Sequence, residues 1–213
     1  MGTKKFKKRV FVCDFETTVY EGQTDTQVWA SACVEIGTED VQIFHSIDET
    51  FDFFISMDTN LVCYYHNLKF DGSFWLDFLL VKLKYKQAYV QYNPDDINTI
   101  EWLKEREMPN KSIRYSITDR GQWYTITIKY NGHIIELRDS LKLLPFSVKR
   151  IGNSFKTKHK KLDMEYTGFR YPGCTITDEE KKYIANDVLV VKEALEIMFT
   201  EGHDKLTIGS CCL

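Results

Sequence analysis

Short apolar runs alternate with helical patterns along most of the chain. Four runs are rich in β-branched and aromatic residues and are bounded by polar turns, which predicts strands. They span residues 9–16 (RVFVCDFE), 26–37 (TQVWASACVEIG), 41–45 (VQIFH) and 61–67 (LVCYYHN). Residues 122–139 (QWYTITIKYNGHIIELRD) predict a tight hairpin, because Asn131-Gly132 separates two alternating runs.

Segments with the apolar period of a helix lie between these strands. They span residues 46–57, 70–85, 145–155 and 177–199. The first begins with Ser46 and Glu49 at capping-box spacing. The last begins with Thr177 and Glu180 at the same spacing. Alternating strands and helices predict an α/β domain with a mixed central sheet flanked by helices.

Residues 88–112 interrupt this order. They are more polar and hold Pro94 and Pro109, so we expect an excursion from the core with one short helix. Residues 206–213 show no core pattern and read as a tail. The chain length and the lack of repeats predict a single domain over residues 1–205, with 88–112 as an insertion.

Two acids close the first apolar run. Side chains two apart leave a strand on the same face, so Asp14 and Glu16 should point the same way as Val10 and Val12. Like charges on a core-directed face repel each other and lose hydration. The pair therefore needs a compensating partner, unless it is an ordinary surface pair.

A third acid, Asp187, lies within the apolar stripe of the last helix. The stripe has spacings of three and four and consists of Ile184, Val188, Val191, Leu195 and Met198. Tyr183 precedes Asp187 by four and shares its side of the helix. No cation on that face can pair with Asp187, because Lys182 and Lys192 point elsewhere. An ion-paired or capping acid is the alternative.

Asp71 is a fourth acid at an inward position, just beyond a buried strand, where capping of the second helix is the alternative role. Hard carboxylate oxygens from separate segments suit Mg²⁺ or Mn²⁺. Two such ions can clamp the attacking and leaving oxygens of a phosphodiester. A lysine or arginine that neutralises Asp187, or a large distance between Asp187 and Asp14, would overturn this hypothesis.

The composition is that of an ordinary soluble protein, with a net charge of -3 over 213 residues. Basic residues gather at 4–9 and at 148–162, which fits a nucleic-acid groove or a solvated helix face. The six cysteines show neither metal-ligand spacing nor a disulfide framework, which favours a reducing, cytoplasmic setting. No apolar stretch predicts secretion or membrane insertion.

Three of these segments, DFET (14–17), HNLKFDG (66–72) and YIAND (183–187), resemble the exonuclease motifs of family B DNA polymerases. More narrowly, DFETT, YYHNLKFDGSF, GQWY, DSLKLLPFSVKRI and YIANDVLVVKEAL resemble the protein-primed phage and plasmid polymerases. The resemblance runs from about residue 9 to about residue 210, apart from 88–112. It implies a ribonuclease H-like exonuclease fold with an inserted β-hairpin region.

The resemblance also implies a site for two Mg²⁺ or Mn²⁺ ions held by the carboxylates of Asp14, Glu16, Asp71 and Asp187. In the family pattern Asp14 contacts both ions, Glu16 and Asp187 hold the first, and Asp71 acts through water.

Two further residues match the family's catalytic set. Tyr183 would orient the attacking water or the scissile phosphate. Lys161, in KLDM with Met164 as the apolar fourth residue, would stabilise phosphate charge. Lys160 is the alternative to Lys161, and either could be an exposed lysine without a role.

Seven positions match residues that hold a single-stranded 3′ end: Thr17, Tyr64, His66, Asn67, Phe70, Ser140 and Leu141. Phe70 and Leu141 would stack on or wedge between bases, which tolerates any base. Core packing is the alternative for these two, and ordinary hydrogen bonding is the alternative for His66.

The implied function is a 3′–5′ exonuclease that releases nucleoside monophosphates, the proofreading part of a protein-primed polymerase in a bacterial host. A priming terminal protein and a polymerase domain would be partners. The polymerase motifs are absent from this sequence, so residues 206–213 read as a tail or as the start of that domain. Two alternatives are a free-standing RNA or oligonucleotide exonuclease, and a non-catalytic binding module for single-stranded DNA or a priming protein. Intact acids count against the binding module.

Overall fold

The structure, a computed structural model, describes residues 8–18, 22, 24–96, 99–166 and 168–211. The strands are β1 (Arg9–Thr17), β2 (Val28–Glu35), β3 (Val41–Phe44), β4 (Leu61–Tyr65), β5 (Lys86–Gln87), β6 (Tyr89–Gln91), β7 (Ile100–Trp102), β8 (Ser112–Ile117), β9 (Trp123–Tyr130) and β10 (His133–Asp139). The α-helices are α1 (Ile47–Ser56), α2 (Leu68–Leu76), α3 (Val148–Ser154), α4 (Asp178–Thr200) and α5 (Ile208–Cys211). A π-helix, η1 (Asp77–Lys82), continues α2, and a 3-10 turn, η3 (Ser140–Lys142), follows β10.

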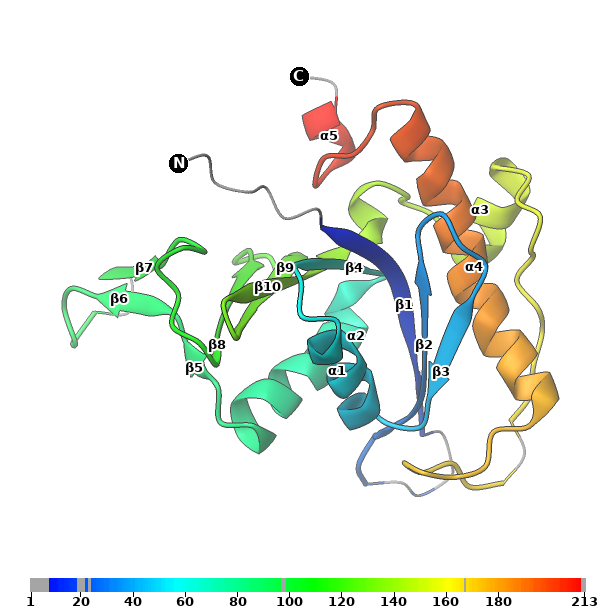
Figure 1. Cartoon of the computed structure of the whole chain (residues 1–213), viewed down its shortest axis with the longest axis horizontal. Coiled ribbons are helices and arrows are strands. Elements are labelled where there is room, and N and C mark those ends of the chain that lie inside the picture. Colours follow the sequence, from blue (N-terminus) through cyan, green and yellow to red (C-terminus); the bar gives the residue numbers. More distant parts are fainter. Residues whose placement is uncertain (1–7, 19–21, 23, 97–98, 167, 212–213) are drawn as a thin grey trace.

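An eight-stranded mixed sheet forms the centre, in the order β3-β2-β1-β4-β10-β9-β8-β5 (Figure 1). β1 runs antiparallel to β2 and parallel to β4, and β4 runs parallel to β10. The predicted mixed sheet flanked by helices is confirmed. Because β1, β4 and β10 are parallel, their carboxyl ends lie at one edge of the sheet, where the polar segments that follow them meet.

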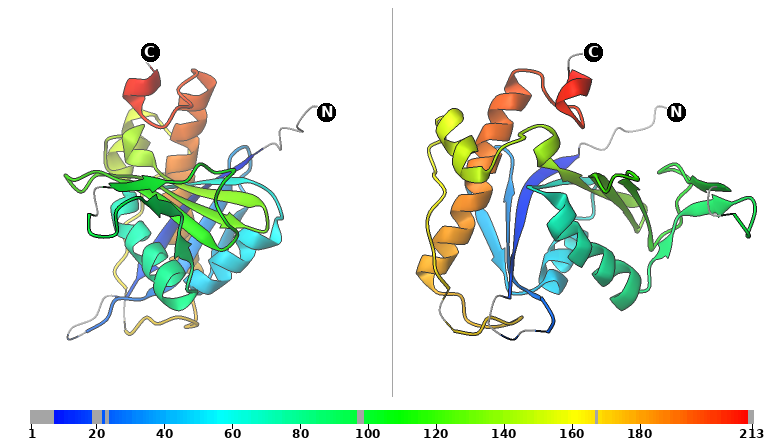
Figure 2. Two further views of the ribbon diagram at one scale, coloured as in Figure 1. Left: turned by 90° about the vertical axis from the view of Figure 1, so that its left-hand side faces the viewer. Right: turned by 180° about the vertical axis from the view of Figure 1, so that it is seen from behind.

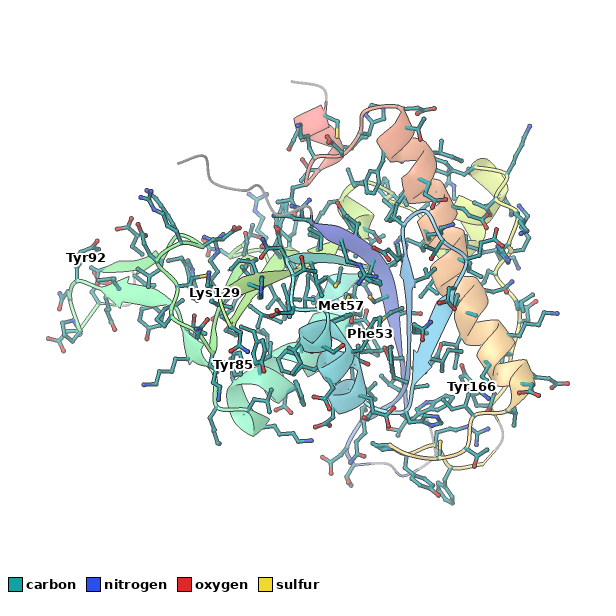
Figure 3. The ribbon with its side chains drawn as sticks, in the orientation of Figure 1. Phe53, Met57, Tyr85, Tyr92, Lys129 and Tyr166 are labelled. Atoms are coloured by element: carbon teal, nitrogen blue, oxygen red, sulfur yellow. The ribbon has the colours of Figure 1, made fainter. Side chains whose placement is uncertain are left out.

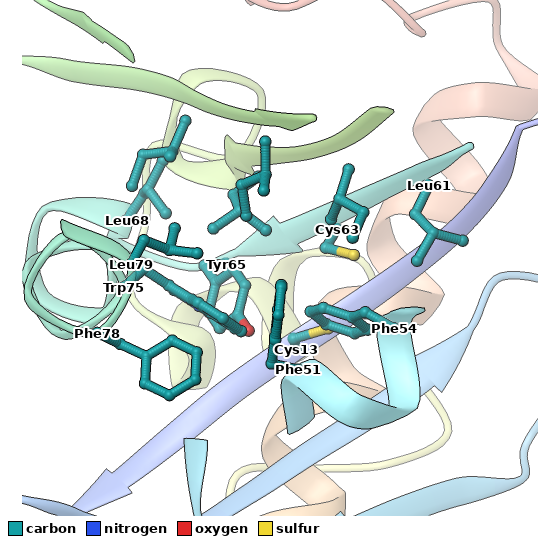
Figure 4. Packing of buried hydrophobic residues seen from close by; sticks show 14 of the residues in the cluster. Cys13, Phe51, Phe54, Leu61, Cys63, Tyr65, Leu68, Trp75, Phe78 and Leu79 are labelled. Carbon is teal, nitrogen blue, oxygen red and sulfur yellow. The ribbon is translucent and has the colours of Figure 1, made fainter. Parts of the chain in front are cut away.

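Alternation along β1 separates two hydrophobic cores. Residues 11, 13 and 15 pack toward α1 and α2 in a cluster around Trp75 (Figure 4). Val10 and Val12 face the other way and pack with the apolar stripe of α4. Figures 1 and 2 show these helices on opposite sides of the sheet. Asp14 and Glu16 continue the face that α4 covers, as the two-residue period predicts.

The 23-residue helix α4 crosses β1, β2 and β3. Its predicted capping box is confirmed, since Thr177 accepts from the amide of Glu180 and the Glu180 carboxylate accepts from the amide of Thr177. The five residues of its predicted stripe are buried. The capping box predicted for α1 is only half formed. Ser46 accepts from the Glu49 amide, but the Glu49 carboxylate accepts from the amide of His45 instead.

The 88–112 insertion forms an arm that projects from the body (Figures 1 and 2). β6 and β7 pair as a separate two-stranded sheet, with Tyr92 near its tip (Figure 3). The described part of this segment contains no α-helix; Thr99 is in a 3-10 conformation, and residues 97–98 beside it lie outside the described residues. Ile100–Trp102 pairs with Tyr89–Gln91, and the rings of Tyr89 and Trp102 meet edge to face at 5.8 Å, a cross-strand contact that stabilises the pair.

The remaining local predictions have mixed outcomes. The hairpin of β9 and β10 is confirmed, with Asn131 and Gly132 both at positive φ, 45° and 83°. Within the tail, residues 208–211 form the unpredicted α5, and Cys211 packs against the α4 core. The five described cysteines are free thiols. Among the described residues, no helix has the length and apolarity that a membrane span requires.

Gly72 provides a test of the packing between α2 and β9. A Cβ at Gly72 would lie 2.8 Å from the Cζ3 atom of Trp123, closer than packed atoms approach. We expect Gly72→Ala to lower the free energy of unfolding by about 1–3 kcal/mol, although alanine is the better helix former. Urea unfolding measures the change.

The matched control is Gly209→Ala in α5, where the nearest atom would be 3.9 Å away. Its unfolding free energy should stay within about 0.5 kcal/mol of wild type. Equal stability of the Gly72→Ala variant and the wild type would contradict the close contact.

Candidate active site

Three of the four predicted acids meet at the carboxyl end of β1. One carboxylate oxygen each from Asp14, Glu16 and Asp187 lie within 4.8 Å of one another. β1 supplies two of them because of its two-residue period, and α4 supplies Asp187 from its buried stripe. Asp187 is only 5% exposed. The structure therefore brings together groups from opposite ends of the chain.

A β-bulge lies next to Glu16. The register of β1 and β2 shifts between Glu16 and Thr17, and Trp29 of β2 is left out of the ladder. The Trp29 indole Nε1 instead donates to the carbonyl of Thr17 at 3.0 Å. Bulges re-aim side chains and are frequent beside active sites. Here the bulge brings the buried Trp29 indole to the backbone of Thr17, the residue after Glu16.

Asp71 approaches the group from the first turn of α2. Its side chain is 2% exposed, and Oδ1 accepts from the amide of Phe15 at 3.3 Å. The N-cap of α2 is Asn67, in the left-handed conformation with φ 74°, so capping is not the role of Asp71. Asp71 lies outside the group of three oxygens but close enough for its charge to raise the pKa of Asp14.

Burial and mutual repulsion disfavour the charged forms of these acids. Burial, and then the charges of Asp71, Glu16 and Asp187, raise the pKa of Asp14 well above its usual range. Burial raises the pKa of Glu16 to about 7 and that of Asp71 to about 8. A bound divalent cation would favour the charged forms instead, so the group is destabilised without one.

Lys161 supplies a cation at Asp187. Its Nζ forms an ion pair with Oδ2 of Asp187 and donates to the hydroxyl of Tyr183 at 2.7 Å. Burial alone would lower the pKa of Lys161, but these hydrogen bonds raise it overall. As predicted, the partner does not come from α4; it comes from the segment that precedes the helix. A lysine in this position is the arrangement that argues against a metal site.

The ion pair between Lys161 and Asp187 nevertheless compensates only part of the negative charge of the three acids. Oδ1 of Asp187 is buried and accepts no hydrogen bond from any described residue. One ammonium faces several acids, and the pKa values of Asp14, Glu16 and Asp187 all stay raised. A buried carboxylate oxygen without a partner, beside two further carboxylates, is a suitable donor set for a hard divalent cation. The residues present fit Mg²⁺ or Mn²⁺, with Lys161 beside Asp187.

The structure distinguishes the two candidate lysines. Lys160 points away from the acids, and its Nζ donates to the carbonyl of Gly152 at 2.7 Å. Lys161 is the one that contacts Asp187 and Tyr183. Periodicity cannot distinguish neighbouring lysines in a segment without helix or strand, so the sequence alone does not decide between Lys160 and Lys161.

Tyr166 is a neighbour of the site that the motifs did not indicate. Its hydroxyl is buried and has no hydrogen-bond partner among the described residues. It lies close enough to Glu16 to lower the pKa of that acid, which partly offsets the rise that burial causes. Its ring meets Trp29 and Tyr183 edge to face, at 5.1 and 5.9 Å. Figure 3 shows Tyr166 beside the amino-terminal part of α4. In the sequence it is one tyrosine in a polar segment, with no pattern to mark it.

Most of the predicted DNA contacts gather at the edge where β1, β4 and β10 end. His66 follows β4, and its Nδ1 lies 2.9 Å from Oγ of Ser140, just after β10. Nε2 of His66 donates to the carbonyl of Phe146 at 2.7 Å. Burial lowers the pKa of His66, so this histidine is a neutral structural link between the two segments.

The other predicted contacts differ in exposure. Phe70 is 47% exposed and meets Phe74 edge to face at 5.5 Å. Leu141 and Thr17 are half-buried. Tyr64 is 2% exposed and packs in the core, where its hydroxyl accepts from Arg138. Phe70 is therefore the most accessible candidate for stacking on a base, and the ring of Tyr64 has no free face.

Asp139 organises this edge, a role that sequence reasoning overlooked. Its Oδ1 accepts from the amides of Asn67, Leu68 and Leu141, at 3.2, 3.3 and 3.1 Å. One buried carboxylate thus fixes the start of α2 against η3. An acid at the end of an apolar strand was visible in the sequence, but not its long-range partners.

Comparison with known proteins places this fold in a family. Residues 54–175, more than half of the chain, match the model of DNA polymerase type B, organellar and viral. The DNA polymerases of Bacillus phage B103 and Bacillus phage phi29 are 37% and 36% identical over 95% and 97% of this chain. The chain covers 33% of the length of each of these curated relatives.

Solved structures agree with this match. Phi29 DNA polymerase complexed with single-stranded DNA matches with a TM-score of 0.79 and 32% identity, over 96% of this chain and 34% of that one. Phi29 DNA polymerase complexed with primer-template DNA matches with a TM-score of 0.77 and 32% identity, over 97% of this chain and 34% of that one. The mixed α/β fold and the resemblance to phage polymerases are thereby confirmed. The chain belongs to the type B DNA polymerases of organelles and viruses.

Proposed function

We propose that this chain is a metal-dependent 3′–5′ exonuclease that hydrolyses the terminal phosphodiester of single-stranded DNA and releases nucleoside monophosphates. The observation that carries the proposal is the meeting of Asp14, Glu16 and Asp187, together with a buried Asp187 oxygen that has no partner among the described residues. Family membership and a relative that is complexed with single-stranded DNA support DNA as the substrate.

Two Mg²⁺ or Mn²⁺ ions, when bound, would lower the pKa of a water and neutralise charge on the leaving 3′ oxygen. Asp14, Glu16 and Asp187 would hold them, and Asp71 would act through water. Lys161 would offer its ammonium to the negative charge of the phosphate. Its contact with the Tyr183 hydroxyl keeps that phenol at the acidic group, where Tyr183 would orient the attacking water or the scissile phosphate.

The 3′ end would lie along the edge formed after β1, β4 and β10. Thr17, Asn67 and Leu141 would line its path, and the exposed ring of Phe70 would stack on a base. Ser140 is 0% exposed, so it would support this path from within and not contact the strand directly. The neutral His66 would join the two sides of this path through Ser140 and Phe146. Tyr64 would support the site from the core.

We further propose a proofreading role within a protein-primed polymerase of a phage or plasmid in the bacterial cytoplasm. The exonuclease domain would comprise residues 1–205 with the arm at 88–112, and residues 206–213 would be a tail or the start of a polymerase domain. That polymerase domain and a priming terminal protein would be its partners. Support comes from the phage DNA polymerases that this chain matches over a third of their length.

Removal of the β1 acids should abolish hydrolysis. We expect Asp14→Ala/Glu16→Ala to lower the release of mononucleotides from 3′-labelled single-stranded DNA in Mg²⁺ by about 1,000-fold or more, because metal ions supply several kcal/mol of transition-state stabilisation. The control is Asp163→Ala, an exposed acid on the segment that carries Lys161, which should keep full activity. Unchanged activity of the double variant would refute the assignment, and faster cleavage of a matched RNA would favour the RNA-trimming alternative.

Metal binding should be visible as a change in stability. The raised pKa of Asp14 means that its charge destabilises the folded state at neutral pH, so Asp14→Asn should raise the Tm in EDTA by about 2–4 °C, the effect of about 1 kcal/mol. Added Mg²⁺ or Mn²⁺ should raise the Tm of the wild type but not of this variant. Asp163→Asn should behave like wild type in both buffers. A wild-type Tm that does not respond to either metal would contradict a metal site.

Phe70 provides a test of the DNA path. Stacking on an aromatic ring contributes about 1–3 kcal/mol per base, so Phe70→Ala should raise the Kd for a labelled oligo-dT by about 5- to 150-fold. Fluorescence anisotropy in the Asp14→Ala/Glu16→Ala background measures binding without degradation. Tyr92→Ala, which removes a 69% exposed ring on the arm, should leave the Kd unchanged. An equal Kd with and without the Phe70 ring would place the strand elsewhere.

A further inference from the structure

The segment of residues 157–166, here named the strap, brings two side chains to the acidic group. It has neither helix nor strand and lies along α4, as the yellow trace beside that helix in Figure 1 shows. Lys161 reaches Asp187 and Tyr183 from it, and Tyr166 reaches Glu16. Because the strap has no backbone ladder of its own, bonds to its neighbours fix its position. Thr157 and Lys160 bind the carbonyl of Gly152 in α3, Lys158 pairs with Glu39, and the residues around Lys161 are also bound by α4.

The strongest of these bonds lies two residues before Lys161. Nδ1 of His159 is 2.5 Å from Oε1 of Glu193, and the backbone amide of His159 donates to Oε2 of the same carboxylate at 3.3 Å. Both side chains are largely removed from solvent, with 22% of the His159 and 14% of the Glu193 side chain exposed. One carboxylate of α4 therefore holds the ring and the backbone of a single strap residue.

Two further hydrogen bonds lie next to His159, one from α4 and one within the strap. Asn186, the residue before Asp187, donates from Nδ2 to the carbonyl of Lys160 at 2.8 Å. Thr157 donates from Oγ1 to the carbonyl of His159 at 2.6 Å. The helix that carries Asp187 thus also carries two anchors of the strap, Glu193 and Asn186. These two bind the residues that immediately precede Lys161, so they contribute to the separation between Lys161 and Asp187.

We propose that Glu193, acting through His159, is a positioning residue for Lys161. The inference rests on the proposed exonuclease function. Without the Glu193 carboxylate, the strap loses both bonds to His159, and the Lys161 ammonium is held less firmly beside the scissile phosphate, by the bond from Asn186 and by its own contacts. A misplacement of about 1 Å at a reacting centre can cost about 100-fold in rate. Glu193 touches neither the DNA path nor the three grouped acids.

A double-mutant cycle tests this role. Glu193→Ala should lower kcat for mononucleotide release from single-stranded DNA by about 10-fold and leave KM nearly unchanged. In a Lys161→Ala background the same substitution should cause no further loss, because the group that Glu193 positions is absent. A merely structural role would give the same loss in both backgrounds.

Matched variants separate positioning from folding. Glu193→Gln keeps an oxygen that can accept from the His159 amide, so it should recover most of the activity. Glu196→Gln is the control, because Glu196 lies on α4 but binds the Gly37 amide and Lys192 instead of the strap. It should keep wild-type kcat. Urea unfolding of each variant establishes that the fold persists.

Three outcomes would count against the proposal. An unchanged kcat in Glu193→Ala would overturn it, and so would an equal additional loss in the Lys161→Ala background. An inactive wild type would overturn the proposed function and this inference together, whereas an active wild type that is indifferent to Glu193→Ala would overturn this inference alone.

Discussion

Repulsion among carboxylates at one edge of the sheet is the constraint on which the rest of this structure depends. One carboxylate oxygen each from Asp14, Glu16 and Asp187 lie within 4.8 Å of one another, the charge of the buried Asp71 acts on Asp14, and all four acids have a raised pKa. The two cores on either face of β1 supply the stabilisation that holds this group together. Lys161 provides one positive charge, and a divalent ion would suit the Asp187 oxygen that has no partner among the described residues.

Helix α4 is the element that makes the site rigid. Its stripe is buried against the sheet, which fixes Asp187, and the same helix holds Tyr183 one turn earlier. It also binds the strap through Glu193 and Asn186, so the same helix helps to position both Lys161 and Asp187. The capping box at Thr177 fixes where this helix begins, and hence the position along the helix axis of each side chain that it carries.

The edge where β1, β4 and β10 end is built on a different principle, a network of satisfied polar groups. Asp139 accepts from three amides of two segments, and His66 joins the same segments through Ser140. These groups fix the backbone that carries Phe70, whose ring stays accessible. The arm of β6 and β7 stands apart from both the acidic group and this edge (Figure 2). The family match then links this geometry to polymerases, although the chain covers only a third of their length.

The sequence by itself determined the features that follow from local periodicity and turn chemistry. Alternation put Asp14 and Glu16 on one face, the three-and-four spacing put Asp187 in a buried stripe, and Asn131-Gly132 made the hairpin. Such features depend on neighbours within a few residues. Tertiary structure alone decided the rest. It selected Lys161 over Lys160, brought Tyr166 and Asp139 into the site, and paired β6 with β7 in the arm. These outcomes depend on contacts between remote segments, and no local pattern of hydrophobic and polar residues encodes which remote group a side chain meets.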